Sequence, residues 1–271
     1  MTFSIVARSA DGLSWGVAVA SKFLAVGSAV PAAAAGVGAI ATQADANVAY
    51  KRLALAALRD GATASTVLAA LLADDDGRDH RQVGIVDAAG GSASHTGSAC
   101  IDWAGGVTGD GVAIQGNCLA GEEVVSTMLA AWDASDPDAA LADRLVVALA
   151  AGDAAGGDKR GRQSAALFVV RAGAGYGGGD DIAADLRVDD HSAPVTELSR
   201  LLALNELYLT ASTDDEKVAV TTDLRAELEA FAAAHGQPDF VTWVGTENYE
   251  MRVAADLSWI DERILAITRG Q

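Results

Sequence analysis

The sequence predicts an α+β protein in which antiparallel sheets are covered by helices. Short apolar segments fill most of the first hundred residues, longer segments with helical periodicity follow, and strand-like and then helical segments return. This order differs from the strict alternation of strand and helix that builds a parallel doubly wound sheet. Hydrophobic residues make up 51% of the 271 and aromatic residues only 5%, so we expect a large core built from Ala, Val, Leu and Ile.

The first half of the chain is interpreted as strands around one helical block. Residues 3–8 alternate apolar and polar side chains, as a half-buried strand does, and the turn at Asp11-Gly12 leads to a second strand. Helices are predicted where apolar residues recur every three or four positions. The predicted strands are 3–8, 15–20, 37–42, 81–87, 91–96 and 111–115, and the predicted helices are 47–59 and 63–72.

Helical patterns dominate the second half. Asp136-Pro137 is typical of an N-cap followed by a first-turn proline, and Thr213-x-x-Glu216 is a capping-box pattern that predicts a helix running to Gly236. We expect a domain over residues 1–212 and a small helical module over 213–271. The remaining predicted elements are helices over 121–132, 137–152 and 195–210, strands over 164–170 and 184–188, and a last helix through Trp259 and Ile264.

Charge and composition exclude several classes of function. Lys plus Arg is 19 and Asp plus Glu is 37, and the difference, 19 − 37 = −18, argues against partners that are nucleic acids or anionic membranes. Two cysteines, Cys100 and Cys118, and four scattered histidines predict neither a disulfide framework nor a metal site. The start of the chain lacks a basic region and a cleavage site. We therefore expect a soluble, cytoplasmic protein that needs no cofactor.

The opening Met1-Thr2 carries a possible mechanism. Removal of Met1 would leave Thr2 with a free amine, whose ordinary pKa of about 7.7–8.0 keeps a useful fraction neutral near physiological pH. That amine could take the proton from the hydroxyl of the same residue, so one residue would supply both nucleophile and base. The first predicted strand begins at once and would hold the terminus in place. Many chains begin Met-Thr without any catalytic role, and this reading stays open beside the catalytic one.

Longer segments resemble a bacterial family known as domain of unknown function 1028. The resemblance is carried by residues 2–8, 16–22, 26–27, 36–43, 81–84, 115–117, 155–166 and 185–191. The family is similar in fold to N-terminal-nucleophile hydrolases, which implies a four-layer αββα sandwich of two antiparallel sheets with a helical C-terminal appendage. Residues 49–52, Gly106 and Cys118 depart from the family pattern, so the resemblance implies no substrate.

Three further residues are candidates for the chemistry around Thr2. Lys22 lies in an apolar strand region, where a charge is costly unless it is paired or functional; it could tune the Thr2 amine or form a buried ion pair. Asn117 could donate amide hydrogens to an oxyanion, or could simply be a turn residue. Asp158 could orient Lys22 or the amine of Thr2.

Other residues are candidates for substrate binding. Lys159 and Arg160 follow a glycine pair and could bind an anionic group, or could join a structural ion-pair network with Asp189 and Asp190. Ser21, Thr42 and Gln43 lie at predicted strand ends, where substrate contact and ordinary packing are both open. Asp189-Asp190-His191 is better explained by helix capping than by a metal, and Cys118 by burial than by nucleophilic attack.

The segment 243–250 resembles a short module that relatives carry as a peptidoglycan-binding-like segment. Its Trp243 and Tyr249 could stack on sugars, but such residues also close small helical cores, and we favour the core interpretation.

The function we expect is that of an amidohydrolase of the N-terminal-nucleophile type. Thr2 would attack a small amide or peptide-like substrate, and the protein would form a homodimer. The alternative is a binding protein without turnover that recognises cell-wall sugars, peptides or another small ligand. A scaffold subunit of a larger assembly is a third interpretation.

Overall fold

The computed structural model describes residues 2–270, and their contacts divide the chain into two units. The first unit ends at Leu202 and the second begins at Ala203. The division falls inside helix α6 (Pro194–Leu209), whereas we expected a boundary at residue 212. Val195, Leu198 and Leu202 pack into the core of the first unit, while Leu207 and Tyr208 pack against that of the second.

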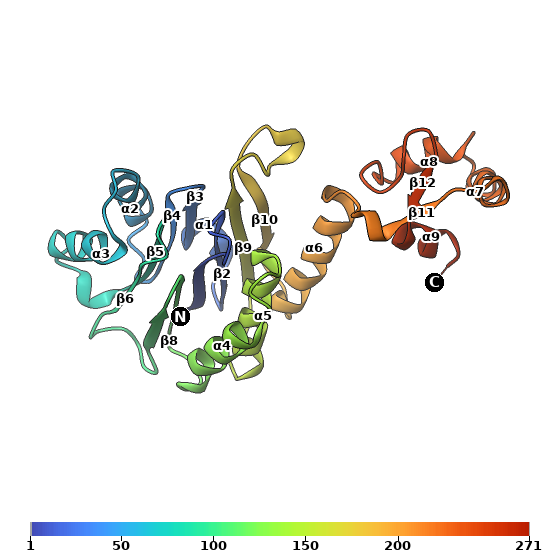
Figure 1. The fold of residues 1–271 in the computed structure, drawn as a ribbon. Helices are drawn as coiled ribbons and strands as arrows, with labels where there is room; N and C mark the ends of the chain where they lie inside the picture. The colour runs from blue at the N-terminus through green and yellow to red at the C-terminus, as the bar shows by residue number, and fades with distance from the viewer. Residues whose placement is uncertain (1, 271) are drawn as a thin grey trace. The chain divides into compact units, whose positions relative to one another are not determined.

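The first unit contains two antiparallel sheets (Figure 1). The six-stranded sheet has the order β10-β9-β2-β1-β8-β7, so the first strand of the chain lies inside the sheet. Its strands are β10 (Ile182–Val188), β9 (Ser164–Arg171), β2 (Ser14–Ser21), β1 (Thr2–Arg8), β8 (Val112–Asn117) and β7 (Gly105–Gly109). The four-stranded sheet has the order β3 (Pro31–Ala34), β4 (Gly38–Ala44), β5 (Arg81–Asp87) and β6 (Ser92–Thr96).

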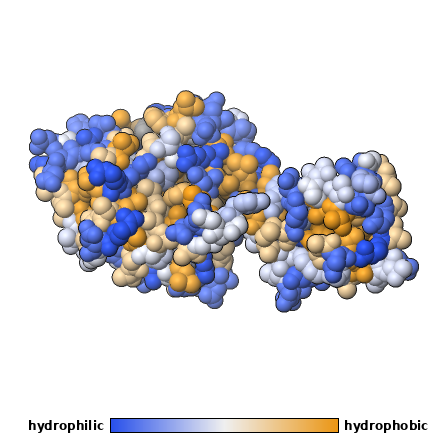
Figure 2. All heavy atoms as spheres, turned by 90° about the horizontal axis from the view of Figure 1, so that it is seen from above, coloured by the Kyte–Doolittle hydropathy of each residue, from blue (hydrophilic) through white to orange (hydrophobic). Residues whose placement is uncertain are grey.

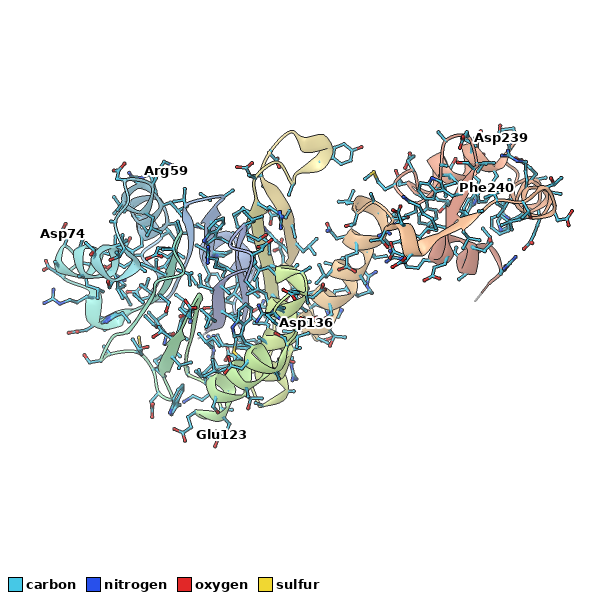
Figure 3. The ribbon with its side chains drawn as sticks, viewed as in Figure 1. Arg59, Asp74, Glu123, Asp136, Asp239 and Phe240 are labelled. Atoms are coloured by element: carbon cyan, nitrogen blue, oxygen red, sulfur yellow. The ribbon has the colours of Figure 1, made fainter. Side chains whose placement is uncertain are left out.

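Helices cover the outer face of each sheet (Figure 1). Helices α4 (Glu123–Ala134) and α5 (Leu141–Ala154) pack on the six-stranded sheet, where Phe3 and Ile5 of β1 meet Met128, Leu145 and Leu149. Helices α2 (Ala49–Arg59) and α3 (Ala64–Ala73) pack on the four-stranded sheet, and α1 (Val26–Ala29) is a single turn after β2. Charged residues at helix ends, such as Arg59, Asp74 and Glu123, are exposed (Figure 3).

The two sheets face each other across a layer of small apolar side chains. Val6 and Val17 of one sheet lie in the same cluster as Ala39, Ala41 and Val86 of the other, and all are fully buried. Because side chains alternate along a strand, these residues occupy the opposite face of each sheet from the one that the helices cover. Complete burial of each valine contributes roughly 1.5–3 kcal/mol. This layer fixes the position of one sheet against the other.

Helix α5 begins later than the sequence predicted. The carboxylate of Asp136 accepts a hydrogen bond from the backbone N–H of Asp138 (3.0 Å), and the backbone N–H of Ala139 donates to the Asp136 carbonyl (3.1 Å). Asp136 and Pro137 therefore form a turn of their own, and the helix starts at Leu141. The expected N-cap at Asp136 is wrong because a local turn competes for the same side chain.

The predicted helix over 213–236 is also wrong in part. Thr213 and Glu216 do form the capping box, but only one 3₁₀ turn follows it. Strand β11 (Lys217–Ala219) then pairs with β12 (Trp259–Asp261), where the sequence predicted helix. Helix α7 (Thr222–Ala234) is a separate helix with its own N-cap, Thr221, whose hydroxyl accepts a hydrogen bond from the backbone N–H of Leu224.

The second unit has its own small core. Helices α7, α8 (Phe240–Thr246) and α9 (Glu262–Thr268) surround buried Leu228, Trp243 and Ile264. Asp239 caps α8 by accepting from the backbone N–H of Thr242 (2.7 Å), and the adjacent Phe240 is buried (Figure 3). The face seen in Figure 2 mixes hydrophilic and hydrophobic residues on each unit. Across residues 2–270, the helices are all too short or too polar to cross a bilayer.

Candidate active site

The layer between the two sheets becomes polar toward the start of β1. Thr2 and Ser4 occupy the same face of β1 as Val6 and are paired in register with Asn117 and Gln115 of β8. Gln43 of β4 and Gln82 of β5 are register partners in the facing sheet. These six side chains are all at most 6% exposed. A cluster of hydroxyl and amide groups therefore replaces the valines and alanines found farther along the same layer.

Both sheets hold Thr2. Its Oγ1 lies 3.1 Å from the Oγ of Ser21, the last residue of β2. Its carbonyl oxygen accepts hydrogen bonds from Gln43 Nε2 (3.3 Å) and from Asn117 Nδ2 (3.5 Å). The structure thus brings together four of the residues named from the sequence, Thr2, Ser21, Gln43 and Asn117.

Gln82 is the centre of this cluster. Its Oε1 accepts from Gln43 Nε2 and from Asn117 Nδ2, both at 2.8 Å. Its Nε2 donates to the backbone carbonyl oxygens of Gly116 (2.7 Å) and Gly105 (3.2 Å) and to Thr96 Oγ1 (2.9 Å). One amide thus connects strands of both sheets, and its burial is matched by hydrogen bonds on each polar atom.

Sequence reasoning missed Gln82, Ser4 and Gln115 as members of the site. A polar residue that alternates with apolar ones is usually interpreted as the solvent-facing side of a strand. Here the polar face is covered by the other sheet, so that interpretation fails. The signal that could have found these residues is the presence of an uncharged amide at matching places in β4, β5 and β8, inside otherwise apolar strands.

Asp158 fixes the loop that approaches the end of β2. Its buried carboxylate accepts from the backbone N–H of Lys22 (2.8 Å) and forms an ion pair with Arg160, with Nη2 3.0 Å from Oδ2. The backbone of Asp158 also forms a bridge with Leu119. Asp158 therefore contacts the main chain of Lys22, directly after Ser21, and not its ammonium group.

Lys22 is not buried, so the expectation that it occupies an apolar strand is wrong. Strand β2 ends one residue earlier, at Ser21, and the Lys22 side chain is exposed. Its Nζ donates to the backbone carbonyl of Arg162 (3.3 Å). No costly buried charge has to be explained at this position.

Two other candidates lie apart from the Thr2 cluster. Thr42 is buried, but neighbouring side chains of a strand point to opposite faces, so Thr42 faces away from Gln43. Its hydroxyl donates to the backbone carbonyl of Asn47 (3.3 Å), which fits ordinary packing. Lys159 is exposed, and its Nζ donates to the backbone carbonyl of Asp102.

A small cavity adjoins Ser21 on the helix-covered side of the sheet. It is lined by Phe3, Ser21, Asp158 and Arg162 among others and has a volume of about 40 Å³. That volume accommodates water but not a drug-sized ligand. Asp153, which also lines it, forms an ion pair with Arg162 (2.7 Å).

Within residues 2–270 there is no group of three His, Cys, Asp or Glu side chains placed to hold a metal. Cys118 is buried and carries a free thiol, in agreement with the packing role expected for it. His191 Nδ1 accepts from the backbone N–H of Ala193 (3.0 Å), so His191 forms a local turn just before α6.

The aromatic residues of the C-terminal segment belong to the core. Trp243 is 5% and Tyr249 is 7% exposed, and their rings lie 5.6 Å apart. Burial raises the pKa of Tyr249 to about 12, with a smaller contribution from neighbouring Tyr208. Rings buried in this way cannot stack on a sugar unless the unit opens.

Comparison with known proteins points to one family. The model of the family of unknown function DUF1028 matches residues 2–198. A crystal structure of a Silicibacter pomeroyi protein, described as a member of the same family, is 30% identical in sequence with a TM-score of 0.68. The similarity covers 79% of this chain and 87% of that one. The search of curated proteins found no match.

Proposed function

The chain belongs to the DUF1028 family, and from that premise and the surroundings of Thr2 we propose that it is an amidohydrolase of the N-terminal-nucleophile type. Thr2 would become the first residue once Met1 is removed, a step that lies outside the described residues. The substrate would be a small amide or a peptide-like molecule, and the reaction needs no cofactor. A cytoplasmic location and a homodimer remain predictions.

The observation that carries this proposal is the position of the Thr2 hydroxyl. Thr2 is the first residue of an inner strand, and side chains from both sheets donate hydrogen bonds to its carbonyl oxygen. Its hydroxyl oxygen lies 3.1 Å from Ser21 Oγ in the polar region between the sheets. A nucleophile needs a fixed position and a neighbouring group that can relay a proton. Ser21 can relay a proton because a hydroxyl both donates and accepts hydrogen bonds.

The fold supports the same proposal. Two antiparallel sheets packed face to face, with α4 and α5 outside one and α2 and α3 outside the other, fit the four-layer αββα sandwich of N-terminal-nucleophile hydrolases. We assign the first unit to that architecture as part of the proposal. In it, Thr2 lies at one end of the layer between the sheets, at the start of β1.

The proposed reaction has two stages. Thr2 Oγ1 attacks the carbonyl carbon of the substrate while the Thr2 amine takes the hydroxyl proton; the C–N bond then breaks, and the leaving nitrogen receives that proton. Water, deprotonated by the same amine, then hydrolyses the resulting ester and restores Thr2. The two stages together consume only the amide substrate and one water molecule.

The observed contacts refine the roles of the neighbouring residues. Asn117 Nδ2 already donates to Gln82 and to the Thr2 carbonyl, so it stabilises an oxyanion only by giving up one of these bonds. Asp158 positions the loop and the backbone of Lys22. Arg160 would have to leave Asp158 to bind an anionic substrate group, while the ammonium of Lys159, bound to a backbone carbonyl, needs a smaller change.

One observation favours the alternative, a binding protein without turnover. The amide hydrogens of Asn117 and Gln43 have partners in the folded chain, as expected for a structural network. In this interpretation the sandwich binds a small ligand and Thr2 only packs. The buried state of Trp243 and Tyr249 argues against cell-wall sugars bound through these two rings.

Substitution of Thr2 tests the proposal. We would measure amine release from a panel of acyl amides and dipeptides by the wild type, Thr2→Ala, Thr2→Ser and the exposed control Ser126→Ala. Alanine and serine at position 2 are both small, so Met1 removal is preserved while the hydroxyl is deleted or kept. We expect at least a hundredfold loss for Thr2→Ala, partial activity for Thr2→Ser and none lost in the control. Full activity of Thr2→Ala, or no turnover with unchanged ligand binding in all four proteins, would reject catalysis by Thr2.

A further inference from the structure

A second polar site lies where the edges of the two sheets meet. Strand β6 is the outermost strand at one edge of the four-stranded sheet, and β7 is outermost at one edge of the six-stranded sheet. A hollow of about 310 Å³ lies along them. We call it the β6–β7 groove, and its lining residues are Ser94, Thr96, Gly105, Gly106, Val107 and Thr108.

The free backbone edge of β7 faces this groove. The backbone N–H of Arg8 donates to the carbonyl of Gly111, so even-numbered residues of β1 bond to odd-numbered residues of β8. The even-numbered residues of β8 therefore bond in the other direction, to residues 105, 107 and 109 of β7. The backbone groups of Gly106 and Thr108 must point away from β8, and both residues are exposed.

Ser94 and Thr96 of β6 line the opposite side, and Ser92 lies on the same face of that strand. Ser92 Oγ donates to the Gly109 carbonyl (2.6 Å), and Thr96 Oγ1 accepts from Gln82 (2.9 Å). Ser94 Oγ, between them on the same face of the strand, is buried and has no hydrogen-bond partner within residues 2–270. Leaving such a group unpaired costs about 1–3 kcal/mol. A ligand that binds there would remove this cost.

Gln115 supplies a second buried atom that lacks a hydrogen-bond partner among residues 2–270. Gln115 Oε1 is buried without a partner in the described part of the chain. It occupies the space left by the missing side chain of Gly84, whose register partner in β6 is Ser94. Two unsatisfied oxygens, one from each sheet, therefore both adjoin Gly84.

The hydrogen-bond relay fixes Gln115 Oε1 as an acceptor. Backbone carbonyls can only accept, so the group that Gln82 directs at Gly116 must be its NH₂. Gln82 Oε1 then accepts from Gln43 Nε2, Gln43 Oε1 accepts from Ser4 Oγ, and Ser4 Oγ accepts from Gln115 Nε2 (2.6 Å). The remaining amide atom of Gln115 is thus an oxygen, and whatever meets it must donate an N–H or O–H group.

The lining of the groove selects an uncharged ligand. All six lining residues are glycine, valine, serine or threonine, so the groove supplies hydroxyl and backbone groups but no charge. At Gly106 an added Cβ would lie 3.0 Å from Ser94 Oγ and 2.9 Å from the Ile114 carbonyl, so the glycine keeps the groove open. An extended peptide has the alternating N–H and C=O groups that pair with a free strand edge.

We propose that the β6–β7 groove binds an extended, uncharged peptide segment as an added strand on β7, with a backbone N–H directed at Ser94. If the proposed hydrolysis holds, the segment belongs to the substrate. Gly105 pairs with Gly116, beside Asn117, the register partner of Thr2. Three strand spacings separate a strand added on β7 from Thr2 on β1, roughly 14 Å, which about four residues of extended peptide span.

Binding of a defined peptide tests the groove separately from catalysis. The probe is acetyl-Gly-Ala-Gly-Ala-amide, titrated into the full chain carrying Thr2→Ala, which cannot cleave it, with backbone amide shifts followed by NMR. The matched control peptide carries N-methyl groups at alternate residues, which remove the donors needed for strand pairing. We expect saturable shifts at Gly106 and Thr108 with the first peptide and at least tenfold weaker binding of the second. Equal affinity for both peptides, or no binding of either, would overturn the proposal.

Two variants locate the site. Ser94→Ala should weaken binding about fivefold, and Gly106→Ala, which fills the groove, at least tenfold, whereas Ser126→Ala on α4 should have no effect. Thermal unfolding of each variant identifies any loss of folding, and the N-methyl comparison needs no variant in the groove. Peptide binding without any turnover by the wild type would reject the proposed hydrolase and keep the proposed groove. Turnover at the same rate in the wild type, Ser94→Ala and Gly106→Ala would keep the hydrolase and reject the groove as part of its substrate site.

Discussion

Gln82 shows how a single side chain organises the candidate site. Its amide accepts two hydrogen bonds from Gln43 and Asn117 and donates to backbone carbonyls of β7 and β8. Because backbone carbonyls cannot donate, this residue determines the direction of every hydrogen bond from Gly116 back to Gln115. The donors that hold the Thr2 carbonyl, on Gln43 and Asn117, depend on it directly.

We predict that Gln82→Leu destabilises the first unit by at least about 2 kcal/mol, because the buried amides of Gln43 and Asn117 lose their acceptor. Urea unfolding at neutral pH measures this change. The control is Gln163→Leu, since the Gln163 amide makes an exposed hydrogen bond, to Asp190. Similar midpoints for the two variants would mean that the relay contributes nothing to stability.

At this scale the sequence foresaw part of the site. The opening Met1-Thr2, the amide of Asn117 and the predicted strand ends made Thr2, Asn117, Ser21 and Gln43 candidates, and the structure brings them together. Gln82 could not be found in the same way, because its burial depends on a second sheet packing over it. Lys22 was misplaced because an apolar run does not show at which residue a strand ends.

At the scale of elements, Asp75 joins two helices to a strand. Its carboxylate accepts from Arg81 of β5 (2.9 Å), from the Tyr50 hydroxyl of α2 (2.7 Å) and from Asn47 (3.2 Å), and it follows the end of α3. The Arg81 guanidinium and the Tyr50 hydroxyl hold the pKa of the Asp75 carboxyl well below its ordinary value. Burial, together with this carboxylate, raises the pKa of Tyr50.

We predict that Asp75→Asn costs on the order of 3 kcal/mol at pH 7, since the partly buried Arg81 guanidinium then keeps only its ion pair with the exposed Asp45 and the Tyr50 hydroxyl loses a charged acceptor. A carboxyl with a lowered folded pKa stabilises the fold above its ordinary value of 3.8 and loses that contribution as the pH falls through and below it. The difference between wild type and variant should therefore be constant from pH 7 to 5 and shrink below pH 4. Urea unfolding at several pH values measures it.

The exposed neighbour Asp74 supplies the control for that experiment. Asp74→Asn should leave both the stability and its pH dependence almost unchanged, because surface charges contribute little. A difference between wild type and Asp75→Asn that stays constant down to pH 3 would contradict a lowered pKa for Asp75.

Elements with a strong local sequence pattern could be predicted. Elements that form only because an adjacent strand pairs with them could not. Strands rich in Val and Ile, such as β1 and β5, carry a clear alternation. Strand β7, with the sequence Gly-Gly-Val-Thr-Gly, has little strand propensity of its own and forms by pairing with β8. The capping box at Thr213 was correctly recognised, but β11 interrupts the helix that should have followed it.

At the scale of the whole molecule, the second unit contains a buried ion pair within a larger network of charges. Arg252 is 1% exposed and Asp261 is fully buried, with Nη1 3.0 Å from Oδ2. Arg252 also donates to the carbonyls of Glu206 and Leu207 at the end of α6, while the Ser212 hydroxyl donates to Asp261. The pair thus connects the end of α6 to β12.

We predict that Asp261→Asn destabilises the second unit by about 2–3 kcal/mol, because buried Arg252 then keeps only its ion pair with the partly exposed Glu216 (3.2 Å). Hydrogen exchange of the full chain should show lost protection in residues 203–270 with little change in β1 and β2. Glu227→Gln, which breaks the exposed pair with Arg269, is the control and should have almost no effect. Equal loss of protection in β1 would mean that the two units unfold together.

The central claim concerns the first residue of the mature chain. Mass spectrometry of the purified protein, before and after treatment with an electrophilic amide analogue, tests it most directly. We predict that the untreated chain has lost Met1 and that the treated chain carries one adduct, on the peptide that begins with Thr2. An active preparation that retains Met1, or an adduct on any other residue with Thr2 unmodified, would contradict the account.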